Sequence, residues 1–199
     1  MPRLYTTTVV LLPLLSIGCA AAPYAGLTGR YNVNFADVEA ESSTFDVEGR
    51  GGGADLEVGA SLDNYPLEFG IGTGANFTQT EPSDDSQFAR TDITTTRLHI
   101  AAVARWISHS EERWLRPFGE AWLGVHHSDN DIEDLAPRFA GLDPTTTGLF
   151  SRAAVGVARF VGRSNTDIRF AAVYEFAQRS ILEADAHNVG IQFQMAQRF

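Results

Sequence analysis

The last segment of the chain has the plainest alternation of apolar and polar residues. From residue 189 onward an apolar side chain recurs at every second position, and only Gln197 interrupts this face. The apolar positions are Val189, Ile191, Phe193, Met195 and Phe199. A period of two residues is typical of a β-strand with one apolar and one polar face. We therefore predict an amphipathic strand over 189–199 that ends at an aromatic residue.

Earlier segments of the chain show the same alternation. The further predicted strands are 27–35, 54–62, 67–77, 94–106, 115–125, 150–160 and 168–176. Most have roughly the nine to eleven residues of a tilted strand that crosses an outer membrane. In 115–125 we take the charge-free side as the outward one, whereas the facing of 150–160 stays open. The pattern predicts an all-β, eight-stranded antiparallel up-and-down transmembrane β-barrel.

The predicted connections alternate between long and short. The long loops are predicted at 37–53, 78–92, 126–148 and 177–187, and the short turns at 63–64, 107–113 and 162–165. The ends of 37–53 can extend the flanking strands. Glycines, prolines and acidic residues are frequent in the long segments, which is typical of loops. If the N-terminus is periplasmic, the acidic loops are extracellular and the tight turns are periplasmic.

The N-terminal segment is predicted to be a secretory signal peptide. Arg3 supplies the positive charge, 9–17 the apolar core, and Cys19 to Ala22 the small residues of a cleavage site. The domain organisation is then a signal peptide at 1–22 and a barrel domain at 23–199. The segment ending at Gly18 and Cys19 resembles the lipobox of bacterial lipoproteins, although Ser16 stands where an aliphatic residue is usual. Lipidation of Cys19 and ordinary cleavage both stay open.

Composition narrows the class of protein. After the N-terminus no apolar run reaches the roughly twenty residues of a transmembrane helix. The formal net charge is −10, which disfavours a nucleic-acid partner because phosphate binding needs clustered basic residues. The chain contains Arg but no Lys. Arg side chains form bidentate pairs with carboxylates.

The polar faces of the predicted strands carry charges of both signs. Five arginines and five carboxylates are expected to face inward: Arg30, Arg97, Arg105, Arg152, Arg169, Asp55, Glu57, Glu68, Glu120 and Glu175. Small residues on the same faces suit a narrow lumen, and charges shielded from water must pair. A soluble lipocalin-like barrel is the alternative, but its apolar face would have to fill the interior. We expect a lumen that is filled by a salt-bridge network.

The terminal strand resembles the C-terminal insertion signal of bacterial outer-membrane barrels, with Phe199 as the terminal aromatic residue. The chain as a whole resembles the small outer-membrane β-barrel family that includes the OmpA transmembrane domain and the opacity-type surface proteins. In 115–125, Arg116, Pro117 and Phe118 look like the start of a family strand, whereas Glu120 and Trp122 depart from its small residues. The resemblance implies an outer-membrane location and eight strands, but no single activity.

The sequence His126-His127-Ser128 is the one candidate for catalysis. It resembles the His-x-Ser element of outer-membrane lipid A deacylases, but Asp129 follows where that family has Asn, and the motif lies far from the C-terminus. A lipid A-modifying enzyme is therefore an alternative function. The plainer interpretation is a group of polar residues at the end of a strand.

Acidic residues are concentrated in the predicted outer loops. They include Asp129, Asp131, Glu133, Asp134, Glu39, Glu41, Asp84, Asp85, Glu183 and Asp185. Such carboxylates could contact divalent cations that bridge to lipopolysaccharide, although an acidic run is usually only a solvated surface. We expect a non-enzymatic outer-membrane barrel with a structural or surface-interaction role and without cofactor or metal. Its expected partners are outer-membrane lipid, lipopolysaccharide and the barrel-assembly machinery, and the partner of the loops is unknown.

Overall fold

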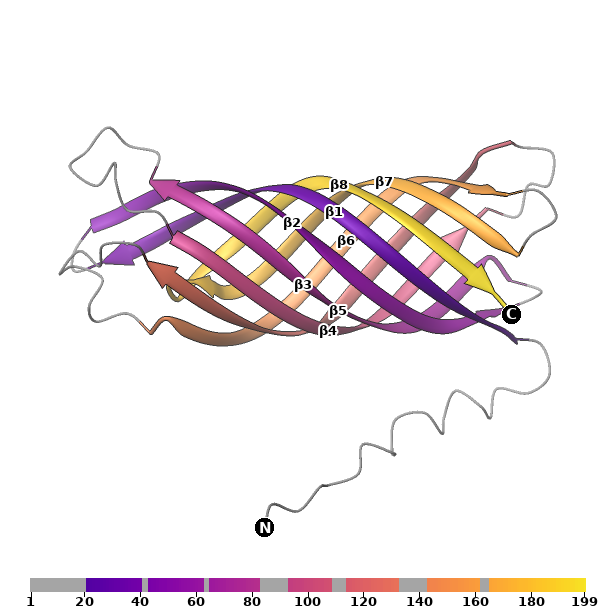
Figure 1. The fold of residues 1–199 in the computed structure, drawn as a ribbon, viewed down its shortest axis with the longest axis horizontal. Helices are drawn as coiled ribbons and strands as arrows, with labels where there is room; N and C mark the ends of the chain where they lie inside the picture. The colour runs from indigo at the N-terminus through magenta and orange to yellow at the C-terminus, as the bar shows by residue number, and fades with distance from the viewer. Residues whose placement is uncertain are drawn as a thin grey trace, which may run out of the picture.

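The computed structural model describes residues 21–40, 43–62, 65–82, 93–108, 114–132, 143–161 and 165–199. These residues form a closed antiparallel barrel in which every strand pairs with its sequence neighbours and β1 pairs with β8 (Figure 1). The strands are β1 (Ala21–Ala40), β2 (Ser43–Leu62), β3 (Leu67–Pro82), β4 (Ile93–Ile107), β5 (Arg116–Ile132), β6 (Thr145–Phe160), β7 (Thr166–Ile181) and β8 (Ala184–Arg198). The predicted eight-stranded fold is confirmed. Among the described residues, no helix is long and apolar enough to cross a membrane.

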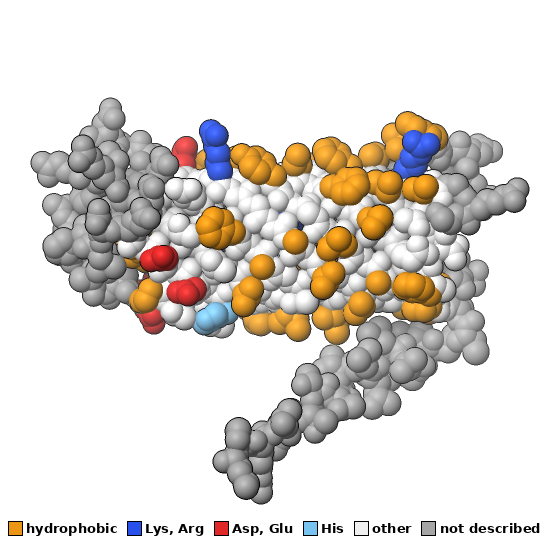
Figure 2. Space-filling view, viewed as in Figure 1, with side chains coloured by type: hydrophobic (Ala, Val, Ile, Leu, Met, Phe, Trp, Pro, Cys, Tyr) orange, Lys and Arg blue, Asp and Glu red, His pale blue; other side chains and the backbone are white. Residues whose placement is uncertain are grey.

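The apolar faces of the strands point away from the lumen. Leu123 and Val155, for example, are 67% and 68% exposed, whereas the alternate positions of the same strands are buried. Figure 2 shows apolar side chains over the wall of the barrel and acidic side chains near the end that carries the longer connections. This facing contradicts the soluble lipocalin-like alternative, in which the apolar face fills the interior. It also agrees with the outward side that was predicted for 115–125.

The segment 37–53 was predicted to be a loop, and this prediction is wrong. β1 continues to Ala40, β2 begins at Ser43, and the two strands pair throughout. Gly53 shows why a glycine here does not break the strand. A Cβ at Gly53 would lie 2.9 Å from Arg30 Nη2 and 3.0 Å from the Asn76 side chain. The missing side chain therefore makes room for a buried guanidinium group.

The segment 177–187 is also not a loop. β7 extends to Ile181, and only two residues separate it from β8, which begins at Ala184. Leu182 and Glu183 form the turn with φ angles of 45° and 70°, and Arg179 has a φ of 53° where the register shifts. A two-residue hairpin turn of this kind usually contains Asn or Gly. Because the sequence has neither residue here, the turn could not be recognised from it.

The other two long loops are shorter than predicted. β3 extends to Pro82, β5 to Ile132, and β6 begins at Thr145. The remaining predicted loop residues, 83–92 and 133–142, lie outside the described residues. The predicted alternation of long and short connections is therefore wrong, because β1–β2 and β7–β8 are joined by two residues each.

An apolar cluster lies at the end of the barrel opposite the termini (Figure 1). Its members, which we call the loop-end plug, are Ala36, Val38, Val47, Ile93, Ala177, Ile181, Leu182 and Ala186. At the other end Phe199 N donates a hydrogen bond of 2.9 Å to Pro23 O, so the last residue is held against the start of β1. The polar lumen lies between these two ends.

Candidate functional site

A first group of charged side chains lies in the half of the lumen next to the loop-end plug. This loop-end cluster consists of Arg30, Asp55, Arg97, His99, Arg152 and Glu175, all 7% exposed or less. Arg30 Nη2 lies 2.8 Å from Asp55 Oδ1, and its Nη1 lies 2.7 Å from Glu175 Oε2. Arg152 Nη1 lies 2.8 Å from Asp55 Oδ2, and Arg97 pairs with Glu175. The pairs Arg30–Glu175 and Arg152–Asp55 join strands that are not neighbours, so the cluster bridges the lumen.

A second group lies nearer the chain termini. This terminus-end cluster consists of Glu57, Glu68, Arg105, Glu120, Asp167, Arg169 and Arg198. Arg105 is its centre: Nη2 lies 2.6 Å from Glu57 Oε2, Nη1 lies 2.7 Å from Glu68 Oε2, and Nε donates to Glu120 Oε2 over 2.6 Å. The guanidinium group therefore links carboxylates from three strands.

An apolar layer separates the two clusters. Along β4, Ala101 and Val103 lie between His99 and Arg105, and both pack with Trp122 and Phe150. The indole of Trp122 lies under the Arg152 guanidinium, 4.5 Å from its Cζ to the ring centroid. A Cβ at Gly72 would overlap the same indole. The bulky Trp122, at a position where the family resemblance implies a small residue, is thus accommodated by a glycine on β3.

All ten residues of the expected inward network lie in the lumen and contact a residue of opposite charge. Sequence reasoning missed Asp167 and Arg198, which pair with each other. Asp167 also pairs with Arg169, and Arg198 also pairs with Glu68. It also missed Tyr24, which donates a hydrogen bond to Glu57. Asp167 could have been found, because it lies two residues before Arg169 and so shares its face.

His126 and Ser128 were expected at the end of a strand, and this placement is wrong because β5 continues to Ile132. Both side chains point into the lumen, with exposures of 2% and 0%. His126 Nδ1 lies 3.0 Å from Ser128 Oγ, and Nε2 lies 2.7 Å from the carbonyl oxygen of Gln178. A carbonyl only accepts, so Nε2 carries the proton and Nδ1 accepts from the serine hydroxyl. The pair has the hydrogen bond of a serine nucleophile and its base, but it is buried.

The predicted insertion signal lies on the outer surface of β8. Val189, Ile191, Phe193 and Met195 are each about half exposed, and Phe199 is 72% exposed. Cys19 lies outside the described residues.

The acidic residues of the predicted loops are only partly described. Asp129 and Asp131 are exposed on β5, and Glu183 and Asp185 are exposed at the β7–β8 turn. Asp84, Asp85, Glu41, Glu133 and Asp134, and the side chain of Glu39, lie outside the described part. In the described ranges no three His, Cys, Asp or Glu side chains are grouped so that they could hold a metal ion.

These features define the class of protein. A closed barrel satisfies its backbone hydrogen bonds between strands, which is the condition for crossing a bilayer without helices. Apolar side chains outside and charged side chains inside are the arrangement of outer-membrane barrels and the reverse of a soluble protein. The protein is therefore an integral β-barrel of the outer membrane.

No protein-family model matches the chain, and no curated protein matches it in sequence. Among solved structures, Neisserial surface protein A is 14% identical with a TM-score of 0.48, covering 87% of this chain and 97% of that one. OprG from Pseudomonas aeruginosa is 13% identical with a TM-score of 0.48, covering 89% and 97%. Ail from Yersinia pestis, in complex with a heparin analogue, is 13% identical with a TM-score of 0.46, covering 89% and 99%. These similarities are distant, and the fold stands on the strand pairing and facing described above.

Proposed function

We propose that this protein is a non-enzymatic outer-membrane barrel with a filled lumen, and that its surface at the loop end makes the functional interactions. The observation that carries the proposal is the set of ion pairs that bridge the lumen. Arg152 on β6 reaches Asp55 on β2, and Arg30 on β1 reaches Glu175 on β7. Side chains that meet inside the lumen in this way occupy space that a column of hydrated ions would need.

The size of the barrel supports the same conclusion. An eight-stranded barrel has an interior just wide enough for side chains, whereas aqueous channels need roughly sixteen strands. Here the interior also contains the indole of Trp122 and, at one end, the loop-end plug. The filled lumen therefore favours a structural or surface-interaction role over transport.

The test is single-channel recording of the purified, folded protein in a planar bilayer, with a known porin as the positive control. We expect no reproducible, long-lived openings, because the bridging ion pairs occupy the lumen. Porin-sized openings in the unmutated protein would contradict the filled-lumen proposal.

The burial of Ser128 argues against the enzymatic alternative. A lipid A deacylase needs a hydroxyl group that a lipid substrate can reach, whereas Ser128 faces the lumen and is 0% exposed. Its contacts with His126 and with Ser180, at 3.0 Å and 3.1 Å, also serve as internal hydrogen bonds. We expect Ser128→Ala to leave the mass spectrum of lipid A unchanged in cells that express the protein. A loss of deacylated lipid A in that variant would instead support the enzyme.

We also propose that the C-terminal strand is recognised by the barrel-assembly machinery. Its support is the apolar outward face of β8 and the exposed Phe199 that follows this strand. Deleting Phe199 should strongly reduce the fraction of protein that reaches the outer membrane as a folded, heat-modifiable species. Phe199→Tyr keeps an aromatic ring and is the control. Normal assembly of the deletion variant would contradict the proposal.

The exposed carboxylates at the loop end support contact with lipopolysaccharide through divalent cations. Asp129 and Asp131 on β5 point outward at this end of the barrel. Carboxylate oxygens are suitable ligands for Ca²⁺ and Mg²⁺. Binding of lipopolysaccharide to the reconstituted protein should therefore weaken when EDTA is added, and an unchanged affinity would contradict this contact.

A further inference from the structure

Two arginines form crossed contacts between β5 and β6 at the terminus end of the barrel, where β1 begins and β8 ends (Figure 1). Arg159, the second-last residue of β6, lies over the ring of Trp114, with 4.4 Å from its Cζ to the ring centroid. Arg116, the first residue of β5, lies over the ring of Phe160 at a distance of 4.5 Å. In the strand register Arg116 is opposite Ala158, the neighbour of Arg159, so both contacts lie at one place on the rim.

Neither arginine forms an ion pair with a described residue. Seven of the ten arginines in the described ranges do so: Arg30, Arg97, Arg105, Arg152, Arg169, Arg179 and Arg198. The third exception is Arg50, which shares the outward face of β2 with Glu48, two residues earlier. β6, in contrast, contains no carboxylate. Two of the three guanidinium groups without a counter-ion in the described part of the chain therefore meet at the β5–β6 rim.

Arg159 lies on the bilayer side of the barrel wall. Its neighbour Ala158 faces the lumen and is 0% exposed, whereas Arg159 is exposed. The outward side chains around it are apolar and between 37% and 42% exposed: Leu115, Val157, Val161 and Ile168. Trp114 is 68% exposed, and aromatic side chains on the outside of a membrane barrel are concentrated where lipid meets water. The Arg159 guanidinium group therefore lies at the level of the lipid headgroups.

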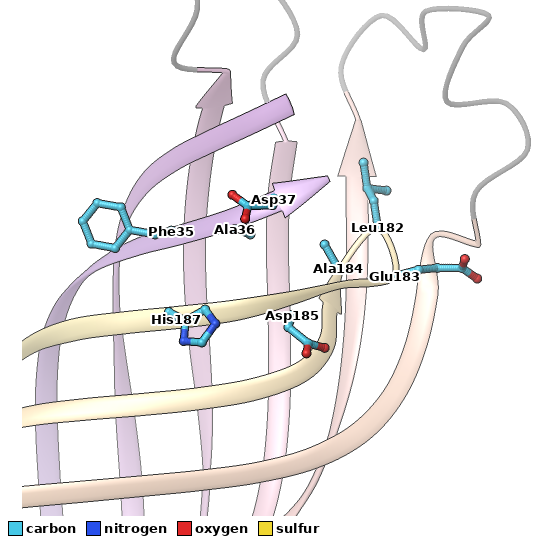
Figure 3. A pocket seen from close by; sticks show the side chains of 8 residues that line it. All are labelled: Phe35, Ala36, Asp37, Leu182, Glu183, Ala184, Asp185 and His187. Carbon is cyan, nitrogen blue, oxygen red and sulfur yellow. The ribbon is translucent and has the colours of Figure 1, made fainter. Parts of the chain in front are cut away.

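The opposite end of the barrel carries charge of the other sign. A cavity of about 780 Å³ lies between β1 and β8 at the loop end (Figure 3). Its lining includes the carboxylates of Asp37, Glu183 and Asp185, which repel an anion. An anionic ligand is therefore disfavoured beside that cavity and favoured at the β5–β6 rim.

The lumen side of the same rim is less suitable for an anion than the bilayer side. A cavity of about 220 Å³ opens there and is lined by Arg116 and Arg198, but also by the Glu68 carboxylate. Arg198 already pairs with Glu68 and Asp167, at 2.6 Å and 3.2 Å. An anion is therefore better placed on the outward side, at Arg159, with Arg116 behind it as a second positive charge.

We propose that Arg159 and Trp114 bind the phosphate group of a phospholipid at the terminus end of the barrel. The guanidinium group donates hydrogen bonds to two phosphate oxygens, a bidentate geometry that Arg and phosphate share. The Trp114 ring holds the guanidinium group against the wall by a cation–π contact, and the acyl chains pack on Val157 and Ile168. The site lies at the end opposite the surface proposed above and requires only a barrel folded in a bilayer.

The test is solid-state NMR of the full chain in bilayers of phosphatidylglycerol and phosphatidylcholine. Dipolar dephasing between isotope-labelled guanidinium nitrogens and lipid phosphorus detects arginines in direct contact with phosphate. We expect Arg159→Gln to remove the dephased signal of one arginine. Arg179→Gln is the matched control, because it removes an exposed arginine that already pairs with Glu183, and it should leave the dephased signal unchanged.

Native mass spectrometry of the folded protein in detergent measures the strength and the source of the contact. We expect one phosphatidylglycerol to bind about threefold more tightly than phosphatidylcholine, the size of effect of one exposed ion pair. Trp114→Leu keeps an apolar side chain but removes the ring, and should reduce this preference. Inorganic phosphate should not displace the lipid, because the apolar rim contributes to binding only when acyl chains are present.

The proposal is overturned if dephasing is unchanged in Arg159→Gln, if Arg179→Gln loses as much of it, or if inorganic phosphate displaces the lipid. Heat-modifiable migration of each variant reports whether the barrel is folded. A lost phosphate contact in a folded variant is therefore distinguishable from failure of the proposed barrel.

Discussion

The two halves of the lumen hold charge in opposite balance. The loop-end cluster has three arginines and two carboxylates, whereas the terminus-end cluster has three arginines and four carboxylates. Neutral side chains complete the hydrogen bonding in both halves. In the terminus-end half, Gln192 and Gln194 donate hydrogen bonds to Glu120 and Glu57.

In the loop-end half the neutral partners are of both kinds. Ser180 Oγ accepts from Arg97 Nη1 over 3.5 Å, whereas Asn188 Nδ2 donates to Glu175 Oε1 over 3.0 Å. His99 Nε2 lies 3.0 Å from Asp55 Oδ1 and donates to that carboxylate, which can only accept. The comparison teaches that the surplus carboxylates of the terminus-end half are satisfied by neutral donors, as the cost of an unsatisfied buried group requires, whereas the loop-end half combines neutral donors with a neutral acceptor.

The largest expected difference between the halves comes from removing one guanidinium group from each. Arg105→Met leaves Glu57, Glu68 and Glu120 without their shared cation, and we expect a loss of about 3–5 kcal/mol in the free energy of unfolding. Arg97→Met leaves Glu175 with two other arginines, so we expect a loss of only about 1 kcal/mol. Urea unfolding of the barrel in lipid vesicles measures both. Equal losses would contradict the argument from opposite charge balance.

A smaller effect is expected at the apolar layer between the halves. Gly72→Ala places a methyl group against the indole of Trp122, which must shift, and overpacking of this kind costs about 1–3 kcal/mol. Gly119→Ala is the control, because a Cβ at Gly119 meets no atom within 4 Å. Urea unfolding should show a loss for the first variant and almost none for the second. If Gly72→Ala were as stable as the control, Trp122 would not form a rigid layer.

The smallest effect concerns backbone strain, which is confined to the loop end among the described non-glycine residues. Glu183 has a φ of 70°, and glycine adopts this conformation without steric cost. Glu183→Gly should therefore raise the free energy of unfolding by about 0.5 kcal/mol, once the greater freedom of glycine in the unfolded chain is subtracted. Glu183→Gln removes the charge but keeps the strain, so a thermal or urea melt should find it unchanged. A gain of the same size in both variants would assign the effect to charge.

The fold could be predicted to a large extent, but the ends of the strands could not. Gly51 to Gly53 resembled a loop because glycine usually interrupts strands, whereas here they lie within β2, and the missing side chain of Gly53 leaves room for the Arg30 guanidinium. The β7–β8 turn was missed because Leu182 and Glu183 adopt a backbone conformation that their residue types disfavour. Both errors occur where tertiary packing overrides a local preference.

The sequence by itself determined the number of strands and, for the ten charged residues of the expected inward network, the side of the barrel on which they lie. The reason is that side chains alternate strictly between the two faces of a strand. When the apolar face of a strand lies against lipid, its polar face must therefore point into the lumen. Only the tertiary structure decided which charges meet. Asp55 and Glu57 are neighbours on one face of β2, yet they belong to different clusters. Their partners come from strands across the lumen, and the height at which those strands meet depends on the register and tilt of the closed barrel, which no local pattern contains.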